Sequence, residues 1–399
     1  MGLLAAAAAL VLTPIAATAA AMASYLIVLS VAAIARPPVP PPAARARRFA
    51  LLVPAHDEER VIERLLASLH GQRYPRDRFV VFVVADNCTD RTAAIARERG
   101  AIVHERVDPT LRAKGHALRW LLERVRAIGP WDAYVVFDAD SVAAPDFLAR
   151  MDARLESGSR AIQAHYAVLN AAASPTAALR EAALASLHYL RPLGRSALGL
   201  SCGLKGNGMC FEAATLDRLG WSSTGLAEDV ELHHTLVRAG VRVDFAPEAL
   251  VRADMPATLD EAESQNLRWE AGRLSALRAD ALPLLRRGLR ERDPVLVDAA
   301  VEQLIPPLSV AIGVSGACVV IAAVLGAQVA AALAAFATAG LVLHVLAGLV
   351  AVRAPVRTYV ALLRAPSYVV WKLALYAKAI VAPAGLPWIR TERGDAANR

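Results

Sequence analysis

The sequence has few lysines, few aromatic residues and few cysteines for its length. Lysine occupies only four of 399 positions, aromatic residues make up 6%, and no Lys or Arg precedes Arg36. The cysteines show no CxxC spacing; they are Cys88, Cys202, Cys210 and Cys318. Without such spacing, neither a zinc ribbon nor a disulfide framework is indicated. We therefore expect no disulfide and no zinc site.

Hydrophobic residues, in contrast, are abundant. They make up 56% of the chain, more than the share usual in soluble domains, and the mean hydropathy is +0.38. Residues 3–35 carry no charge and exceed the roughly 20 residues that a membrane-spanning helix needs. We therefore expect a transmembrane helix in residues 1–35. A cleaved signal peptide is the alternative, but it requires basic residues at its start and a shorter apolar core.

Two further apolar runs lie near the C-terminus. Residues 304–327 and 329–352 meet at a short Gly-containing joint, which predicts a transmembrane hairpin within residues 299–352. In residues 368–382, Lys372 and Lys378 interrupt the apolar pattern, which suits a helix lying in the membrane interface. We assign residues 353–399 to this helix and a cytoplasmic tail; a fourth span is the alternative. The basic segment 388–393 is read as an anchor, with gating as the alternative.

Positive charge predicts the orientation in the membrane. Basic residues follow the first and third predicted spans, whereas the N-terminus and the hairpin tip have none; they are Arg36, Arg45, Arg47, Arg48, Arg353, Arg357 and Arg364. By the positive-inside rule, the middle segment and the tail lie on the cytoplasmic side. We expect an integral protein of a bacterial plasma membrane. The net charge of +7 then indicates contact with anionic lipid rather than with nucleic acid.

The middle of the chain has the pattern of a soluble α/β domain. Residues 36–48 are rich in Pro and Arg and predict a stiff linker. In the domain, residues 49–298, short apolar runs alternate with helical patterns; strands are expected at 49–53, 79–85, 101–104 and 133–137, and helices at 58–70, 90–99, 114–125 and 171–185. This alternation predicts a Rossmann-like, mostly parallel sheet, whose ligands bind beyond the carboxyl ends of the strands.

Acidic residues follow three of these expected strands. The first two strands are followed by the clusters around Glu58 and Asp86, and the last by Asp138-Ala139-Asp140. So many carboxylates at one sheet edge are costly without cations or hydrogen-bond donors. Two carboxylates one residue apart can both reach a hard divalent cation, which can bridge a diphosphate. We therefore predict that Asp138 and Asp140 bind Mg²⁺ or Mn²⁺.

These clusters resemble those of the family 2 glycosyltransferases of the GT-A fold. The similarity is to the membrane-bound branch that includes cellulose, hyaluronan and poly-N-acetylglucosamine synthases, and it covers about residues 49–275. It implies a nucleotide-sugar site in which the first cluster holds the nucleoside, the second contacts the base or ribose, and Lys114 and Asp138 face the diphosphate. The residues assigned to the first two clusters are Pro54, His56, Glu58 and Asp86.

Three further motifs carry the resemblance. The loop Gly206-Asn207-Gly208 resembles the family's glycine-rich loop beside the acceptor, where missing side chains let a sugar approach the backbone. Glu228-Asp229 resembles the acidic pair in which the aspartate is the general base, with Glu228 beside the acceptor. Gln265, Arg268 and Trp269 match the QxxRW motif. On a helix these three share one face, where Gln265 and Arg268 would hold phosphate and Trp269 would support a sugar ring.

The resemblance implies an inverting, metal-dependent transfer of sugar from a nucleotide-sugar, expected to be a UDP-sugar, to a growing polysaccharide or a glycolipid. Transfer of a single sugar to a lipid is one alternative, and a non-catalytic subunit of a polysaccharide-export complex is another. Export or synthase subunits are candidate partners. Gln163 and His165 fit either the donor pocket or a strand edge, and His233 and His234 are expected to be structural.

Overall fold

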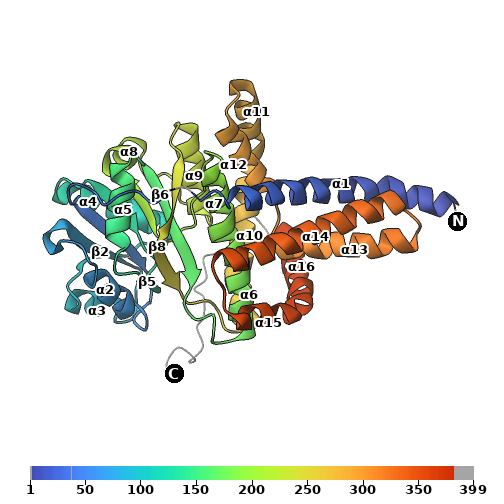
Figure 1. Cartoon of the computed structure of the whole chain (residues 1–399). Coiled ribbons are helices and arrows are strands. Elements are labelled where there is room, and N and C mark those ends of the chain that lie inside the picture. Colours follow the sequence, from blue (N-terminus) through green and yellow to red (C-terminus); the bar gives the residue numbers. More distant parts are fainter. Residues whose placement is uncertain (1, 37, 382–399) are drawn as a thin grey trace.

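A mixed eight-stranded sheet forms the centre of the protein (Figure 1). The computed structural model describes residues 2–36 and 38–381. The strand order is β3-β2-β1-β4-β7-β6-β8-β5. The strands are β1 Phe49–Ala55, β2 Phe79–Asp86, β3 Ile102–Arg106, β4 Ala133–Val136, β5 Ser141–Ala143, β6 Ala161–Val168, β7 Met209–Glu212 and β8 Val243–Ala253.

The first half of the sheet is parallel, as its βα alternation predicts. β1 pairs in parallel with both β2 and β4, and β2 with β3. β7 then runs antiparallel between β4 and β6, β6 pairs in parallel with β8, and β5 is antiparallel to β8. The carboxyl ends of β1, β2 and β4 therefore meet at one edge, where the three acidic clusters emerge.

Helices cover both faces of this sheet (Figure 1). The helices of the domain are α2 Ile62–His70, α3 Thr92–Glu98, α4 Lys114–Ile128, α5 Phe147–Glu156, α6 Pro175–Leu184, α7 Arg191–Ala197, α8 Ala213–Leu219, α9 Glu228–Arg238 and α10 Leu259–Ala276. They are followed by α11 Leu282–Glu291 and α12 Pro294–Leu304, which project from the domain. Single turns of 3₁₀ helix lie at Arg76–Arg78 and Leu362–Arg364, and π-helical segments at Ala185–Leu190 and Leu277–Ala281.

The start of α2 differs from the sequence-based prediction. The helix begins at Ile62, four residues after the expected start at 58. The backbone N–H of Glu58 donates to Thr92 Oγ1 at 2.7 Å, and that of Glu59 to Asp90 Oδ2 at 3.0 Å. These bonds hold residues 58–61 in a turn against the loop after β2, so the helix starts only beyond it.

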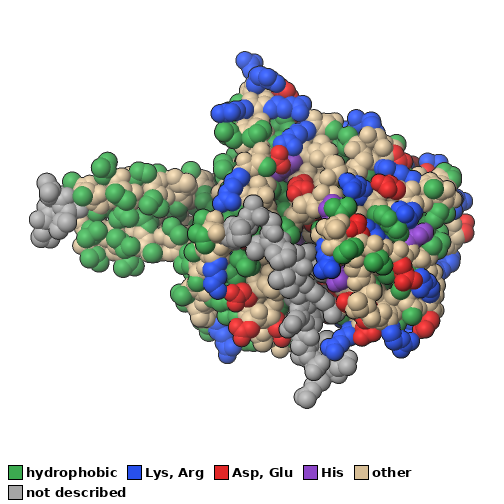
Figure 2. Space-filling view, turned by 180° about the vertical axis from the view of Figure 1, so that it is seen from behind, with side chains coloured by type: hydrophobic (Ala, Val, Ile, Leu, Met, Phe, Trp, Pro, Cys, Tyr) green, Lys and Arg blue, Asp and Glu red, His purple; other side chains and the backbone are tan. Residues whose placement is uncertain are grey.

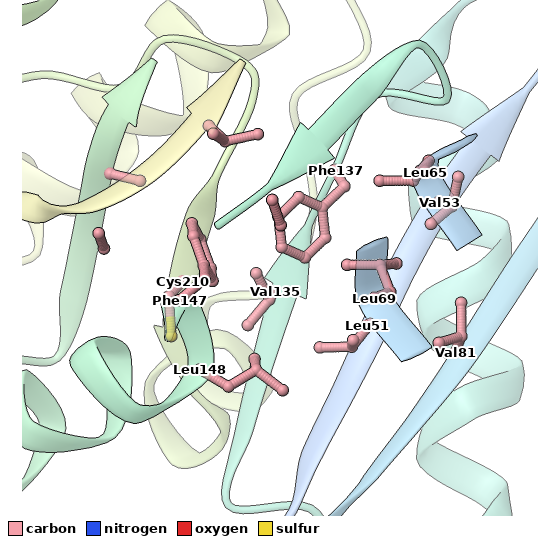
Figure 3. Close-up of a cluster of buried hydrophobic side chains, with 14 of the residues drawn as sticks. Leu51, Val53, Leu65, Leu69, Val81, Val135, Phe137, Phe147, Leu148 and Cys210 are labelled. Atoms are coloured by element: carbon pink, nitrogen blue, oxygen red, sulfur yellow. The ribbon is translucent and has the colours of Figure 1, made fainter. Parts of the chain in front are cut away.

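Alternate residues of the strands build two cores. From β1, Leu51 and Val53 pack with Leu65 and Leu69 of α2 on one face (Figure 3). Leu52, between them in sequence, is buried with α4, α7 and α9 on the other face. This is the two-residue period of a strand covered on both sides.

Three helices extend away from the domain side by side (Figure 1): α1 Gly2–Ala32, α13 Leu308–Val324 and α14 Gln328–Ala351. Two segments of the described chain are long and apolar enough to cross a membrane, Ala5–Ala32 and Gln328–Ala351. A third span exists if α12 and α13, bent by 66° relative to each other, count as one.

The first helix of the predicted hairpin starts later than the apolar run, which begins at residue 304. Pro306 and Pro307 separate α12 from α13, because proline lacks the N–H that would continue a helix. The first arm therefore begins at Leu308 and has 17 residues. Its tip lies beside the start of α1, at the end remote from the domain (Figure 1), and a Cβ at Gly326 would be 3.7 Å from Ala5 Cβ.

The C-terminal helices, α15 Val356–Ala361 and α16 Ala365–Val381, return toward the domain. α16 crosses the direction of α13 and α14 and packs against α10 and α13 (Figure 1). Lys372 of α16 is buried, and its Nζ lies 2.8 Å from Glu270 Oε1 of α10. The expected tail segment 388–393 lies outside the described residues.

Candidate active site

A cavity of about 930 Å³ opens at the carboxyl ends of β1, β2 and β4. Every predicted site residue except Asn207 and Gly208 lies in its wall. The strand ends contribute Pro54, His56, Glu58, Asp86, Asp138 and Asp140. Helices and loops add Lys114, Gly206, Glu228, Asp229, Gln265, Arg268 and Trp269. Folding thus gathers motifs that are far apart in the sequence around one space.

The loops after β1 and β2 hold each other at one end of the cavity. His56 Nδ1 lies 2.6 Å from the Asp86 carbonyl oxygen, and the Asp57 carboxylate accepts the Thr89 N–H at 2.6 Å. Asp57 and Asn87 have φ values of 54° and 52°, a left-handed conformation that is uncommon for residues other than glycine and is enriched at functional loops. The two loops therefore form one unit.

Asp86 is fixed by a partner that the sequence patterns did not identify. The Arg106 Nη1 atom at the end of β3 lies 2.5 Å from Asp86 Oδ1, and Arg106 is buried. β2 and β3 pair in parallel, and their register places Asp86 opposite Arg106. The carboxylate of Asp86 is therefore held in one orientation at the cavity wall.

Lys114 stands at the centre of the polar cluster. It is the first residue of α4, and its Nζ lies 2.5 Å from Asp138 Oδ1, 2.6 Å from the Gly206 carbonyl oxygen and 3.4 Å from Glu228 Oε1. Burial alone would lower the pKa of Lys114, but the carboxylates of Asp138 and Glu228 outweigh this effect and raise it. The ammonium is thus charged at any physiological pH, next to a helix N-terminus that also favours anions.

The acidic pair lies in the first turn of α9, where backbone N–H groups favour negative charge. Burial raises the pKa of Glu228 to about 7 and also raises the pKa of Asp229, while Lys114 opposes both shifts. Gly206, with φ of 77°, leaves room opposite the pair: a Cβ there would lie 3.5 Å from Lys114 Nζ and 3.6 Å from Asp229 Oδ2. A carboxylate with a raised pKa beside an open space is a candidate proton acceptor.

The raised pKa of Glu228 predicts how stability changes with pH. Because the folded state holds this proton more tightly than the unfolded state, the stabilisation is complete at low pH and is lost as pH rises through about 7. We expect the unfolding temperature of the wild type to fall from pH 6 to pH 8 by more than that of Glu228→Gln. Thermal unfolding in detergent across this range checks it; equal pH slopes for the two proteins would contradict it.

Asp138 and Asp140 fit the type of ligand that a hard divalent cation prefers. Both carboxylates lie in the cavity wall, and oxygen ligands suit Mg²⁺ and Mn²⁺. Within the described residues, the group of three metal-type ligands that lie close together is a different one, Asp57, Cys88 and Asp90. The Asp57 carboxylate there accepts backbone N–H groups of the neighbouring loop, so that cluster has a structural explanation.

Asn207 and Gly208 lie under the site rather than in it, which corrects the acceptor contacts expected of them. Asn207 is fully buried; its Oδ1 accepts the Asp138 N–H at 3.2 Å and its Nδ2 donates to Ser141 Oγ at 2.8 Å. A Cβ on Gly208 would lie 2.7 Å from Val251 Cγ1, so glycine is needed for packing on β8. Asn207 thus positions the turn that carries Asp138.

Gln163 and His165 also support the site from below. Gln163 is fully buried on β6, and its amide donates to the Asn207 carbonyl oxygen and accepts from the Lys205 N–H, each at 2.8 Å. His165 packs against Tyr189. Neither residue lies in the cavity wall, and both are on β6, an inner strand between β7 and β8 rather than an edge of the sheet. His233 and His234 are hydrogen-bonded to Ser201 and Asp280.

The QxxRW segment lies on α10, whose start is defined by a capping box. Thr258 Oγ1 accepts the Glu261 N–H, and Glu261 Oε2 accepts the Ala257 N–H. Gly272 brings this helix against the chain just before the acidic pair, since a Cβ there would lie 3.0 Å from the Leu226 carbonyl carbon. The face of α10 with Gln265, Arg268 and Trp269 therefore closes the cavity opposite the sheet.

Arg180 is a cavity residue that the sequence analysis missed. It lies on α6 and is only 5% exposed, with its Cζ 4.9 Å from the centre of the Trp269 ring. Its Nε and Nη2 atoms, and Oε1 of Gln265, have no hydrogen-bond partner among the described residues. Buried polar groups without partners are costly and point to a polar ligand. A lone arginine in an Ala-rich helix was the available sequence signal.

A second missed group is a buried chain of charges between the first helix and the glycine-rich loop. Arg195 is fully buried; its Nε lies 2.9 Å from Asp298 Oδ2 and its Nη1 2.8 Å from Glu302 Oε1. Asp298 also accepts the Tyr25 hydroxyl of α1 at 2.5 Å, and Glu302 lies 3.4 Å from Lys205 Nζ. Tertiary contacts alone bring these residues together.

A mostly parallel sheet with its cavity at the carboxyl edge is the GT-A architecture that the sequence predicts. Residues 46–272 match the family model described as glycosyltransferase like family 2, and the chain belongs to that family. A mannosyltransferase from Pyrobaculum calidifontis, solved with GDP-Man and Mn²⁺, covers 86% of this chain and 97% of its own with a TM-score of 0.52. At 20% sequence identity, that likeness concerns the fold.

Curated relatives share part of the chain. A probable glycosyltransferase of Bacillus subtilis, YdaM, is 27% identical over 56% of this chain and 55% of its own length. A beta-monoglucosyldiacylglycerol synthase of Synechocystis is 31% identical over 46% of this chain and 38% of its own. The chain therefore matches about half, or less, of the length of these relatives.

Proposed function

We propose that this chain is a membrane-bound glycosyltransferase that moves a sugar from a nucleotide-sugar to a lipid acceptor at the cytoplasmic face. The observation that supports this proposal is that one continuous cavity joins the sheet edge to the membrane helices. Its wall runs from the sheet edge, with Asp86, Lys114 and Asp138, to apolar side chains of the membrane helices, including Ile312 of α13 and Val345 of α14. A molecule with a polar head and an apolar tail fits such a space.

The donor is proposed to lie along the strand ends. The loops after β1 and β2 would hold the nucleoside, while the Lys114 ammonium and the Arg268 guanidinium would balance the negative charge of the diphosphate. Asp138 and Asp140 would hold a divalent cation, which supplies further positive charge to the diphosphate when bound. The similarity of the fold to an enzyme solved with a nucleotide-sugar and Mn²⁺ supports this arrangement.

Asp229 is proposed to accept the proton of the attacking hydroxyl. As the acceptor oxygen bonds to the anomeric carbon, the bond from that carbon to the diphosphate breaks on the opposite side, so the configuration inverts. The proton moves to the Asp229 carboxylate and the nucleoside diphosphate leaves with the electron pair. Burial, which raises the pKa of Asp229, makes the carboxylate a stronger base than an exposed aspartate.

The acceptor head group is proposed to lie between α6 and α10. There the unpartnered Arg180 nitrogens and Gln265 oxygen would form hydrogen bonds with it beside the Trp269 ring. The relatives named as glucosyldiacylglycerol synthases support a lipid acceptor. Extension of a polysaccharide is the alternative.

Product analysis tests this function. Purified protein in proteoliposomes would be supplied with UDP- and GDP-sugars, with Mg²⁺, Mn²⁺ or EDTA, and nucleoside diphosphate release and lipid mass would be measured. We expect release that requires a metal and a lipid, and a product carrying one added sugar. A ladder of sugars would favour polysaccharide extension, and no release with any donor would favour a non-catalytic subunit.

The apolar end of the cavity gives a residue-level prediction. Ile312→Trp should fill this end of the cavity and leave the nucleotide affinity unchanged. We expect KM for the lipid acceptor to rise about tenfold or more, which corresponds to a loss of about 1.4 kcal/mol of binding free energy. Val314→Trp is the matched control, since Val314 lies on the same helix, is exposed and is outside the cavity wall. Equal KM values for the two variants would contradict a lipid tail at this position.

A further inference from the structure

The helices α11 and α12 form an arm that projects from the body across the direction of α1 (Figure 1). The two helices pack closely, with Leu284 of α11 buried against Leu296 and Ala299 of α12. A Cβ at Gly288 would lie 2.8 Å from the Val297 backbone nitrogen, so glycine permits this approach. The arm is thus a built element of the fold rather than a loop.

The outer face of α11 mixes leucine and arginine. Leu282 and Leu289 are 51% and 64% exposed, and Arg286 and Arg290 are exposed as well. These residues occupy positions i, i+4, i+7 and i+8, which lie on one side of a helix. Large leucines in water cost free energy, so this face is suited to a partner that accepts both apolar and cationic groups.

The positive charge of the arm is concentrated on α11, whereas α12 and the turn before it carry Asp293, Asp298 and Glu302. Residues 282–292 contain four arginines and one acidic residue, Glu291, which pairs with Arg287 and Arg290. Figure 2 shows basic side chains gathered on this projection with hydrophobic side chains between them. A partner that fits must therefore carry negative charge over an apolar layer.

The position of the arm selects that partner. α12 is followed by Ile305-Pro306-Pro307 and then directly by α13, so the arm ends where the chain enters the predicted membrane region. In Figure 1 the arm points upward, across the direction of α1, and lies near the domain end of α1. This end is followed in the chain by the basic residues after the span. An element in this place can run along the surface of a bilayer that α1 spans.

We propose that α11 binds the surface of an anionic phospholipid leaflet. Leu282 and Leu289 would enter the boundary between headgroups and acyl chains, while Arg286 and Arg290 would bind lipid phosphates. This contact would hold the domain at a fixed height and tilt over the membrane. It depends on the membrane helices but not on sugar transfer, so it can fail or hold independently of the proposed reaction.

Fluorescence quenching by lipid tests the proposal. Leu289→Cys would be labelled with bimane and reconstituted in vesicles of phosphatidylcholine with phosphatidylglycerol, containing a lipid with a spin label near the headgroup. Label on the unsubstituted protein gives the blank for the native cysteines. We expect intensity to fall at least about twofold, since an interfacial helix sits within reach of such a quencher, and to recover in part when Arg286→Gln and Arg290→Gln are added.

The matched control is Ile128→Cys. Ile128 is 47% exposed and ends α4, which starts at Lys114 in the cavity and runs away from it. Its label should not be quenched. Equal quenching at positions 128 and 289, or no effect of the two arginine substitutions, would overturn the proposal. Unfolding temperatures of all variants establish that each is folded.

Discussion

Asp229→Asn is expected to reduce the rate of sugar transfer by about 10²–10⁴-fold, the usual contribution of a general base. Asparagine has the shape of aspartate but cannot take up the proton of the acceptor hydroxyl. The Val230 N–H that donates to Asp229 Oδ1 at 2.9 Å can still donate to an amide oxygen. The affinity for the nucleotide-sugar should therefore change little, and kcat rather than KM should carry the loss.

Glu231→Gln provides the matched control for this substitution. Glu231 lies in the same turn of α9 and accepts the Gly225 N–H at 3.1 Å, a bond that the glutamine oxygen can keep. We expect nearly normal turnover for this variant. Initial rates of nucleoside diphosphate release and equilibrium binding of the donor separate the two effects. An Asp229→Asn enzyme with wild-type kcat would exclude Asp229 as the base.

The second large effect is expected on stability. Arg195→Met should lower the free energy of unfolding by about 3–5 kcal/mol, because removing one partner leaves buried charges uncompensated. Arg195 is fully buried between Asp298 and Glu302, whose side chains are only 6% and 9% exposed. Methionine retains much of the volume of the aliphatic stem but offers no positive charge. The unfolding temperature should fall by about 10 °C.

Removing the two carboxylates as well should restore part of this loss. In Arg195→Met combined with Asp298→Asn and Glu302→Gln, neither carboxylate that faced Arg195 is charged, and neutral replacement of a buried ion network is often tolerated. The recovery is only partial because Lys205 Nζ, 3.4 Å from Glu302, loses its ion pair. Thermal unfolding of the single and triple variants in the same detergent makes the comparison. A triple variant less stable than Arg195→Met would show that the uncompensated carboxylates are not the main cause of the effect.

The parallel half of the fold could be predicted from the sequence because its signals are local. The runs that became β1, β2, β3 and β4 have the composition of buried strands, and glycine, proline and acidic residues separate them from the helices. The second half was less accessible. β7 enters antiparallel between β4 and β6, and no local pattern of residues encodes which strands become neighbours.

The membrane helices show a similar division. Their apolar composition was sufficient to locate α1 and α14. The place where α13 starts depended on Pro306 and Pro307, whose effect hydropathy alone does not register. Lys372 shows what a local pattern does not register: this charge in an otherwise apolar run is buried against Glu270, because a tertiary partner offsets the cost of its burial.

The sequence by itself determined which side chains are proposed to carry the chemistry. Carboxylates at strand ends, a lysine at the start of a helix and the QxxRW spacing are short-range patterns, and their functional groups have the same properties wherever they lie. Only the tertiary structure decided which of them share a cavity: Asn207 lies beneath it, while Arg180 reaches it and Arg106 holds Asp86 at its wall. The reason is physical, since burial and pairing depend on neighbours that are distant in the chain and become defined only when the sheet and helices pack together.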